Sequence, residues 1–193
     1  HAPTAVFGGM NQFLYQYGED SAFFRVFGPE KRLRSLLKKF PRVARNCEII
    51  NADEVISGTD KIRDVIRHAQ GTSMYMAIKD VREGNSAAVV SAGNTGVLMA
   101  LSKLALKTVD GISRPAITTM LPSGDGDTRV VGLDLGANVQ CDEEILFDFS
   151  IMGSVYADII GGMKRPRVGI LNIGEEETKG SETLQRLNKI LTE

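Results

Sequence analysis

The feature that most limits the possible folds is the alternation of strand-like and helix-like segments along almost the whole chain. Short apolar runs rich in β-branched residues predict strands, and longer amphipathic segments predict helices. We predict strands at 22–27, 47–51, 86–91, 116–121, 129–135 and 167–173, and helices at 5–17, 30–40, 60–68, 73–83, 95–107, 142–160 and after Gly180. The strands on either side of the turn at 122–128 are expected to pair as a hairpin at a sheet edge. The alternation predicts an α/β fold with three α/β/α layers and a mostly parallel sheet.

The bulk composition limits the function. The chain has 193 residues, 42% of them hydrophobic, which is enough for one sizeable core. A net charge of −1 gives no reason to expect a nucleic acid as partner. Two distant cysteines, Cys47 and Cys141, fit a reducing compartment better than a disulfide framework, and we see no signal peptide or membrane span. No repeat or linker interrupts the pattern, so we predict one domain, 1–193, which we expect to be incomplete at both ends.

Three loops of similar composition follow three of the predicted strands. They are Ser91-Ala-Gly-Asn-Thr-Gly96, Asp134-Leu-Gly-Ala-Asn138 and the segment from Asn172-Ile-Gly174 to Lys179-Gly180. Glycine lets a ligand approach the backbone closely, and asparagine offers an amide donor and acceptor. One such loop alone is more often structural. In a parallel sheet, however, all three would lie at the carboxyl edge, where open α/β folds bind ligands. We therefore predict a binding site there.

Lys179 indicates what this site binds. An ammonium group beside the N-terminus of a helix suits an anion, above all phosphate. The lysine precedes the glycine, so the loop is not a Walker A motif, and the chain contains no G-x-G-x-x-G dinucleotide motif. We expect Glu175, Glu176 and Glu177 to orient Lys179 or to pair elsewhere, with a metal cluster as a weaker alternative. We expect no metal and no cofactor.

Two other features have a functional and a structural interpretation. Cys141 follows the second loop and has the chemistry of an acyl-accepting nucleophile, but only His1 and His68 exist to activate it, which favours a packed thiol. The basic segment 31–40 has leucines at helical spacing, so a solvated helix face is the default interpretation. The alternative is docking of an acidic partner or a membrane surface.

Several segments resemble the phosphate acyltransferase family of bacterial phospholipid synthesis, the PlsX family. The resemblance rests on His1-Ala-Pro3, the loop at 91–96, Arg114-Pro-Ala116, Leu133-Asp-Leu-Gly-Ala-Asn138, Met152-Gly-Ser-Val-Tyr-Ala157 and Pro166-Arg-Val-Gly-Ile-Leu-Asn-Ile-Gly-Glu-Glu-Glu-Thr-Lys-Gly180. It implies transfer of a long-chain fatty acyl group from acyl carrier protein to inorganic phosphate, giving acyl phosphate. It also implies a fold related to phosphate acetyltransferases and isocitrate dehydrogenase-like enzymes. Members are cytoplasmic homodimers that associate peripherally with the membrane, which we expect to involve a carboxyl-terminal part absent here.

The resemblance assigns roles to the loop residues. Phosphate is a competent nucleophile and a thiolate leaves readily, so the reaction needs positioning and oxyanion stabilisation more than a strong base. We expect Lys179 and Asn138 to be catalytic, with Lys179 holding phosphate or the oxyanion and Asn138 positioning the carbonyl. The expected phosphate- and substrate-binding residues are Ser91, Asn94, Thr95, Gly96, Asn172, Gly174 and Gly180. The alternatives are a short-chain acyl-coenzyme A phosphate acyltransferase, an isocitrate dehydrogenase-like oxidoreductase, and a non-catalytic module that binds a carrier or phosphate.

Overall fold

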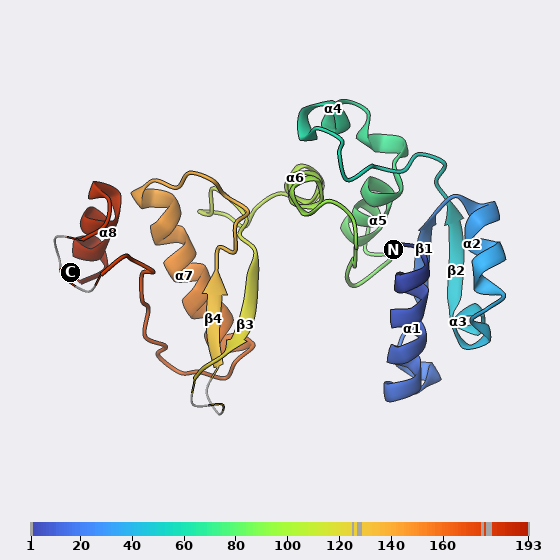
Figure 1. The fold of residues 1–193 in the computed structure, drawn as a ribbon, viewed down its shortest axis with the longest axis horizontal. Coiled ribbons are helices and arrows are strands. Elements are labelled where there is room, and N and C mark those ends of the chain that lie inside the picture. The colour runs from blue at the N-terminus through green and yellow to red at the C-terminus, as the bar shows by residue number, and fades with distance from the viewer. Residues whose placement is uncertain (1, 125, 127–128, 175, 177–178, 193) are drawn as a thin grey trace. The chain divides into compact units, whose positions relative to one another are not determined.

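The computed structural model describes residues 2–124, 126, 129–174, 176 and 179–192. Its contacts divide the chain into two compact units, 1–107 and 108–193. Each unit is described by itself, and the prediction of a single domain stays a prediction. Figure 1 shows the elements of both units.

The first unit contains a two-stranded parallel sheet with helices around it (Figure 1). Strands β1 and β2 pair in parallel from Phe24 opposite Cys47 to Gly28 opposite Asn51, which confirms strands near both predicted places. The elements are α1 (Thr4–Tyr17), the short 3-10 helix η1 (Glu19–Ser21), β1 (Phe24–Gly28), α2 (Glu30–Leu37), α3 (Pro41–Arg45), β2 (Cys47–Asn51), α4 (Ile62–Arg67), η2 (Ala69–Gly71), α5 (Ser73–Arg82) and α6 (Thr95–Leu106). Proline at 41 starts α3, as expected at a first helical position, where its missing N–H costs nothing.

Two groups of buried apolar side chains hold this unit together. One joins α1, α2 and α3 beside the sheet and consists of Phe7, Met10, Leu14, Leu33 and Val43. The other joins α4, η2, α5 and α6 and consists of Val65, Ala69, Met74, Ile78, Val97, Leu101 and Ala105. An ion pair, 2.6 Å between the half-buried Arg25 on β1 and the buried Asp80 on α5, also joins a helix to the sheet. The same carboxylate accepts a hydrogen bond from the Ser86 hydroxyl, which fixes the chain beyond α5.

The second unit is a hairpin with two helices. Strands β3 (Thr118–Pro122) and β4 (Arg129–Leu133) are antiparallel, as predicted, with Thr118 opposite Leu133. Helix α7 (Glu143–Ile159) begins at an Asp142 cap that accepts a hydrogen bond from the Ile145 N–H, and α8 (Glu182–Thr192) follows Gly180. An ion pair between Arg186 and Glu143 joins the two helices.

Two of the predicted strands are not strands in this structure. Segments 86–91 and 167–173 run without strand pairing, and no backbone–backbone hydrogen bond is found for residues 87–92 or 168–173 among the described parts of the chain. Several of their apolar side chains lie in solvent, with Val90 93% and Leu171 97% exposed, whereas Val89 packs against the core formed by α4, α5 and α6. A strand exists only when a neighbour accepts and donates its backbone hydrogen bonds, so pattern alone was insufficient.

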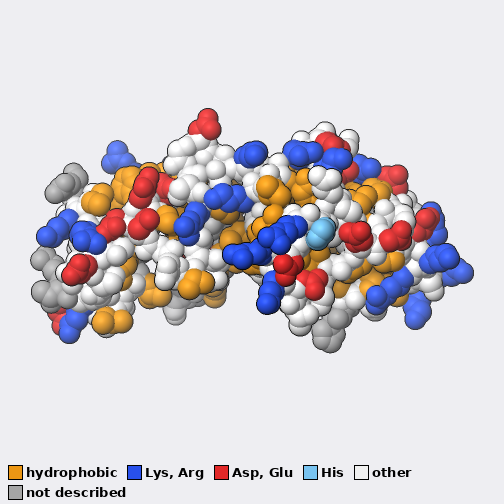
Figure 2. All heavy atoms as spheres, turned by 90° about the horizontal axis from the view of Figure 1, so that it is seen from above, with side chains coloured by type: hydrophobic (Ala, Val, Ile, Leu, Met, Phe, Trp, Pro, Cys, Tyr) orange, Lys and Arg blue, Asp and Glu red, His pale blue; other side chains and the backbone are white. Residues whose placement is uncertain are grey.

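The structure therefore has an α/β fold whose parallel sheet, in the described residues, has two strands. Among the described helices, none is both long and apolar enough to cross a membrane. Cationic and anionic side chains mix over the face shown in Figure 2, as expected from the small net charge.

Candidate functional site

The loop at 91–96 uses its polar groups to start α6. The Asn94 Oδ1 accepts a hydrogen bond from the Val97 N–H at 3.0 Å, the usual geometry of a helix cap. The Asn94 Nδ2 donates to the Gly58 carbonyl oxygen at 3.1 Å. The Ser91 hydroxyl accepts from the Gly93 N–H at 3.2 Å, whereas Thr95 is exposed at the first turn of α6. Gly96 packs closely against Ile62, because a Cβ there would lie 3.2 Å from the Ile62 Cδ1.

The loop at 134–138 is organised by Asp134, which comes directly after β4. Its carboxylate accepts hydrogen bonds from the backbone N–H groups of Ile117, Ala137 and Asn138, the last at 2.8 Å. The Asn138 amide nitrogen donates to Asp134 at 3.1 Å and to the Pro115 carbonyl at 3.0 Å. Both amide hydrogens of Asn138 therefore have partners within the protein, and its Oδ1 is the atom that remains for a ligand.

The environment of Asp134 acts on its pKa in two directions. Burial raises the pKa of this carboxyl, but the hydrogen bonds from Asn138, Ile117 and Ala137 stabilise the charged form, and the net pKa lies below its ordinary value. The carboxylate is therefore ionised near neutral pH and holds the loop closed. Asp134 is not among the site residues predicted from the sequence. Its position directly after a strand and before a glycine turn is the pattern that indicates a loop-closing aspartate.

The third loop closes on itself through Asn172. The Asn172 Nδ2 donates to the Lys179 carbonyl oxygen at 3.1 Å, and its Oδ1 accepts from the Ile173 N–H at 2.8 Å. The Lys179 N–H donates to the Glu176 carbonyl oxygen at 2.9 Å. Ser181 then starts α8, where its hydroxyl accepts from the Leu184 N–H at 3.3 Å. The two ends of the loop are thus held together in front of a helix N-terminus.

Two glycines allow the close contacts inside this loop. Gly180 has φ +85°, a left-handed conformation that favours glycine, and a Cβ there would lie 2.5 Å from the Asn172 Oδ1. At Gly174 a Cβ would lie 2.9 Å from the Lys179 Cγ and 2.8 Å from the Glu176 Oε2. A larger residue at Gly180 would displace the Asn172 amide that closes the loop, and one at Gly174 would displace the side chains of Glu176 and Lys179.

A cavity of about 640 Å³ lies beside the loop. Segment 168–174 forms one side and α8 forms the other, and Glu176 and Lys179 also line it. Lys179 is exposed, and within the described residues its ammonium group has no ion pair or hydrogen bond. Glu176 is exposed and likewise forms no ion pair with a described residue, while Glu175 and Glu177 lie outside the described residues. A cation that lines a cavity and has no partner among the described residues has the chemistry to bind an anion.

Cys141 has the properties of a packed thiol. Burial raises its pKa, and the Asp134 and Asp142 carboxylates raise it further, while Arg114 opposes them. A raised pKa leaves less of the nucleophilic thiolate near neutral pH. The raised pKa of Cys141 supports its interpretation as a packed thiol and not as a nucleophile.

The loops 134–138 and 172–180 belong to the second unit, and the loop 91–96 belongs to the first. A common sheet edge for all three stays a prediction, and two of the strands on which it depended are unpaired here. Within each loop the expected residues Ser91, Asn94, Asn138 and Asn172 are bound to neighbouring parts of the chain, whereas Lys179 and Thr95 are exposed.

Comparison with known proteins places the chain in a family. A family model described as "Fatty acid synthesis protein" matches residues 1–193. A phosphate acyltransferase of Maricaulis maris is 40% identical over 98% of the chain and 53% of its own length, and one of Neorickettsia sennetsu is 42% identical over 100% and 55%. One of Ehrlichia ruminantium is 39% identical over 100% of the chain and 56% of its own length. The chain spans about half the length of these curated relatives. From one end to the other, the chain therefore belongs to the fatty acid synthesis protein family, whose members here are phosphate acyltransferases.

Proposed function

We propose that this protein transfers a long-chain fatty acyl group from acyl carrier protein to inorganic phosphate and releases acyl phosphate. The relatives that match the chain along its whole length are named phosphate acyltransferases, which supports this class of reaction. The observation that carries the proposal for the site is the exposed Lys179, which lines the 640 Å³ cavity and whose ammonium has no partner among the described residues.

The proposed reaction makes one bond and breaks one. A phosphate oxygen attacks the thioester carbonyl carbon, the carbonyl oxygen becomes an oxyanion, and the carbon–sulfur bond then breaks. The thiolate leaves and takes up a proton from solvent. Lys179 stabilises negative charge on phosphate or on the oxyanion. The backbone N–H groups at the start of α8 add hydrogen-bond donors with partial positive charge.

The other expected residues complete this proposal. Asn172 and Gly180 hold the 172–180 loop in shape, and Gly174 lets the Lys179 side chain pack across the loop. Ser91, Asn94, Thr95 and Gly96 would contribute a second phosphate-binding loop. Asn138 would position the acyl carbonyl, and its loop is kept in place by the Asp134 carboxylate.

The resemblance extends the proposal to the whole protein. It includes a three-layer fold with a larger parallel sheet, related to that of phosphate acetyltransferases and isocitrate dehydrogenase-like enzymes. It also includes a cytoplasmic homodimer with peripheral membrane association. Pairing of segments 86–91 and 167–173 as strands would be the structural sign of that larger sheet, because both already have the sequence pattern of buried strands.

The reaction is tested by trapping its product. The chain, and the chain extended to the length of its relatives, are mixed with long-chain acyl carrier protein and phosphate, and acyl phosphate is captured with hydroxylamine. We expect product that requires both substrates. Parallel reactions replace the donor with a short acyl-coenzyme A or supply a 2-hydroxy acid with a nicotinamide cofactor.

Each alternative has its own outcome. Product from short acyl-coenzyme A but not from acyl carrier protein would identify the short-chain enzyme. A change in nicotinamide absorbance would identify the oxidoreductase. Binding of carrier or phosphate without any product, in the extended chain too, would leave only the non-catalytic module.

A further inference from the structure

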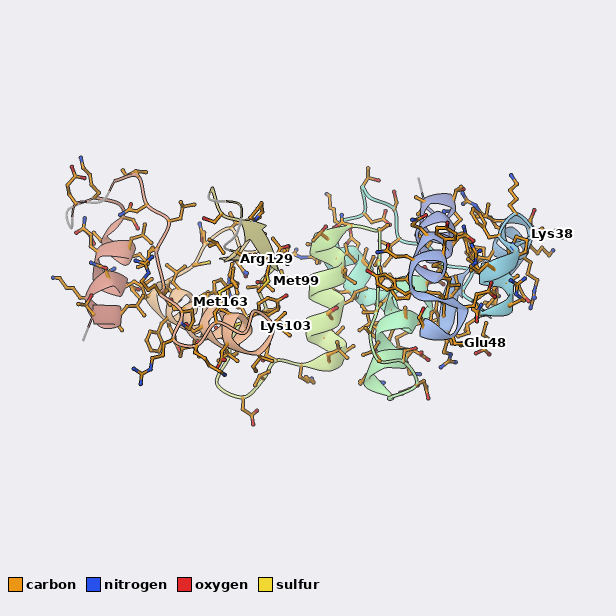
Figure 3. All side chains as sticks on the ribbon, turned by 90° about the horizontal axis from the view of Figure 1, so that it is seen from below. Lys38, Glu48, Met99, Lys103, Arg129 and Met163 are labelled. Carbon is orange, nitrogen blue, oxygen red and sulfur yellow. The ribbon has the colours of Figure 1, made fainter. Side chains whose placement is uncertain are left out.

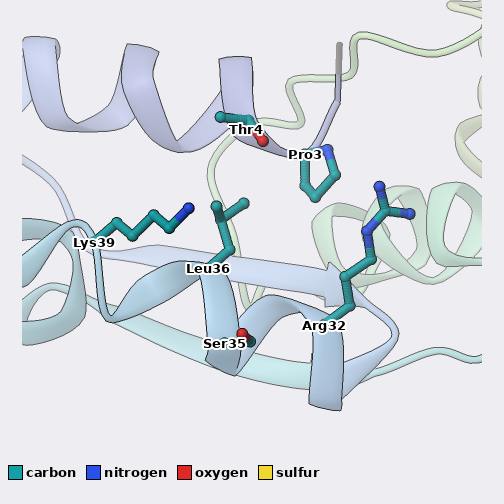
Figure 4. Close-up of a pocket in the computed structure, with 6 residues that line it drawn as sticks. All are labelled: Pro3, Thr4, Arg32, Ser35, Leu36 and Lys39. Atoms are coloured by element: carbon teal, nitrogen blue, oxygen red, sulfur yellow. The ribbon is translucent and has the colours of Figure 1, made fainter.

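A small basic cavity lies in the first unit, and none of its lining residues belongs to the loop at 91–96. Its volume is about 290 Å³, at the lower limit of ligand pockets. Figure 4 shows its lining, which comes from the start of α1 with the proline before it, from α2, and from the turn that follows α2. The lining residues are Pro3, Thr4, Arg32, Ser35, Leu36 and Lys39.

Two cations from neighbouring parts of the chain face this cavity. Arg32 lies on α2, whereas Lys39 lies in the turn after the helix ends, where its backbone N–H donates to the Leu36 carbonyl oxygen at 3.0 Å. Ser35 and Leu36 lie between them at the intermediate turn. Figure 4 shows the Lys39 side chain extending along the cavity toward Leu36 and Thr4, and the Arg32 guanidinium beside Pro3.

Neither cation is neutralised within the described part of the chain. Three arginines nearby have acidic partners: Arg34 pairs with Glu30 at 2.6 Å, and Arg42 and Arg45 both pair with Glu19. The side chains of Arg32 and Lys39 form no ion pair or hydrogen bond with a described residue, and no carboxylate is among the lining residues. The carboxylates of Glu19 and Glu30 therefore pair with other arginines and not with the two cations of the cavity.

The polar groups in the cavity match one class of ligand. Two cations can form charge-assisted hydrogen bonds to phosphate oxygens, and the hydroxyls of Thr4 and Ser35 can donate to others. The start of α1 has no side-chain cap, and the backbone N–H groups there carry partial positive charge, which adds to that of the two cations. Pro3 and Leu36 give an apolar surface for a short substituent.

We propose that the cavity formed by Arg32, Lys39, Thr4 and Ser35 binds a phosphate ester. The proposal is independent of the reaction assigned to Lys179. The phosphate group belongs either to a small soluble ester or to a lipid headgroup, since both present the same oxygens.

The test measures binding of methyl phosphate and of phosphatidylcholine vesicles with and without phosphatidic acid. It uses the Lys179→Ala chain, so that the loop at 172–180 does not contribute. The test variant is Arg32→Gln with Lys39→Gln. The matched control is Lys31→Gln with Lys38→Gln, which removes the same charge at the same spacing from residues that do not line the cavity. Lys38, labelled in Figure 3, lies just past the end of α2.

We expect the test variant to weaken binding about tenfold or more, and the control to change it less than about twofold. Only the test variant loses charge-assisted hydrogen bonds to the ligand. Selective loss of methyl phosphate binding identifies a small ester, and selective loss restricted to phosphatidic acid vesicles identifies a headgroup. Equal weakening in both variants would mean diffuse charge attraction and would overturn the proposal. So would the absence of binding to either probe.

A second variant keeps the two cations. Ser35→Asp places a carboxylate in the cavity at an exposed helix position, where folding is expected to be unaffected. We expect it to abolish binding, and unchanged binding would contradict the site. Circular dichroism of every variant verifies that the helices are intact.

Discussion

The loop at 91–96 and the loop at 172–180 are built from the same residue types but differ in what they leave exposed. In the first, the Asn94 amide is used up by the Val97 N–H and the Gly58 carbonyl, and the loop contains no cation. In the second, Asn172 makes the equivalent internal bonds, to Ile173 and Lys179, and a lysine side chain remains exposed beside a cavity.

The comparison distinguishes two roles of a loop rich in glycine and asparagine: holding the backbone in shape and positioning a charged side chain. In both loops the amide holds the backbone in a shape that precedes a helix. Only the 172–180 loop adds a charged group whose position that shape determines. We infer that in the 172–180 loop Asn172 mainly holds the backbone in shape and Lys179 is the chemically active residue. Whether Asn94 does more than hold its own loop is tested by mutation below.

The largest effect is expected from Lys179→Ala. Loss of one group that stabilises developing charge lowers turnover on the order of a hundredfold or more. The free energy of unfolding should change by less than about 0.5 kcal/mol, because the side chain is exposed. Product formation and urea unfolding are the two measurements. Lys189→Ala, an exposed lysine of α8 outside the cavity lining, is the control with the same charge change. A rate within a few-fold of the parent would remove Lys179 from the site.

A smaller effect is expected from Gly180→Ala. Both this change and Gly111→Ala put a side chain at a positive φ, +85° and +83°, which costs about 1–2 kcal/mol of stability. Only at Gly180 would the new Cβ meet Asn172, since nothing lies within 4 Å at Gly111. We expect turnover to fall about tenfold to a hundredfold at Gly180 alone, because the lysine is displaced. Equal activity in the two variants would show that the shape of the loop does not matter.

Asn94 tests the architectural side of the comparison. Asn94→Ala should cost about 1 kcal/mol of unfolding free energy through the lost helix cap, whereas Asn94→Ser keeps a capping oxygen and should cost only a few tenths. Chemical denaturation measures both. If Asn94 mainly caps α6, serine restores activity along with stability. Activity that stays low in the stable serine variant would instead assign the amide to phosphate binding.

The smallest effect is expected from pH at Asp134. Its pKa is lowered by folding, so its contribution to stability is fully present above the ordinary value of 3.8 and is lost as pH falls through the lower folded value. The stability difference between the parent and Asp134→Asn should therefore shrink as pH is lowered from 7 to about 3. Unfolding curves at several pH values measure it, and a difference that grows toward acid would contradict the assigned role.

Local signals predicted most of the helices and the hairpin. The start of α6 at Thr95 and of α7 beside Asp142 follow from capping residues, and β2 was predicted with its observed bounds. These features depend on neighbours in sequence. The helix after the 172–180 loop was also predicted, because a glycine followed by a polar segment is a local pattern, and the assignment of site residues in this loop stays a prediction.

The pairing of strands that are distant in the sequence could not be predicted from the sequence alone. Segments 86–91 and 167–173 have strand composition, but Val90 and Leu171 are almost fully exposed, because a strand needs a partner that composition does not specify. The bonds of Asn138 to Asp134 and Pro115 depend equally on tertiary contacts, so its amide could be predicted as polar but not as already engaged.

The most direct test of the central claim is a residue-resolved phosphate titration. Inorganic phosphate is added to the isotope-labelled chain, and backbone amide shifts are followed by nuclear magnetic resonance in the parent and in Lys179→Ala. We predict saturable shifts at described residues of the 172–184 segment that disappear in the variant, while any shifts around Arg32 persist. Shifts in that segment that survive the loss of Lys179, or none there at all, would contradict the assignment of phosphate binding to this loop.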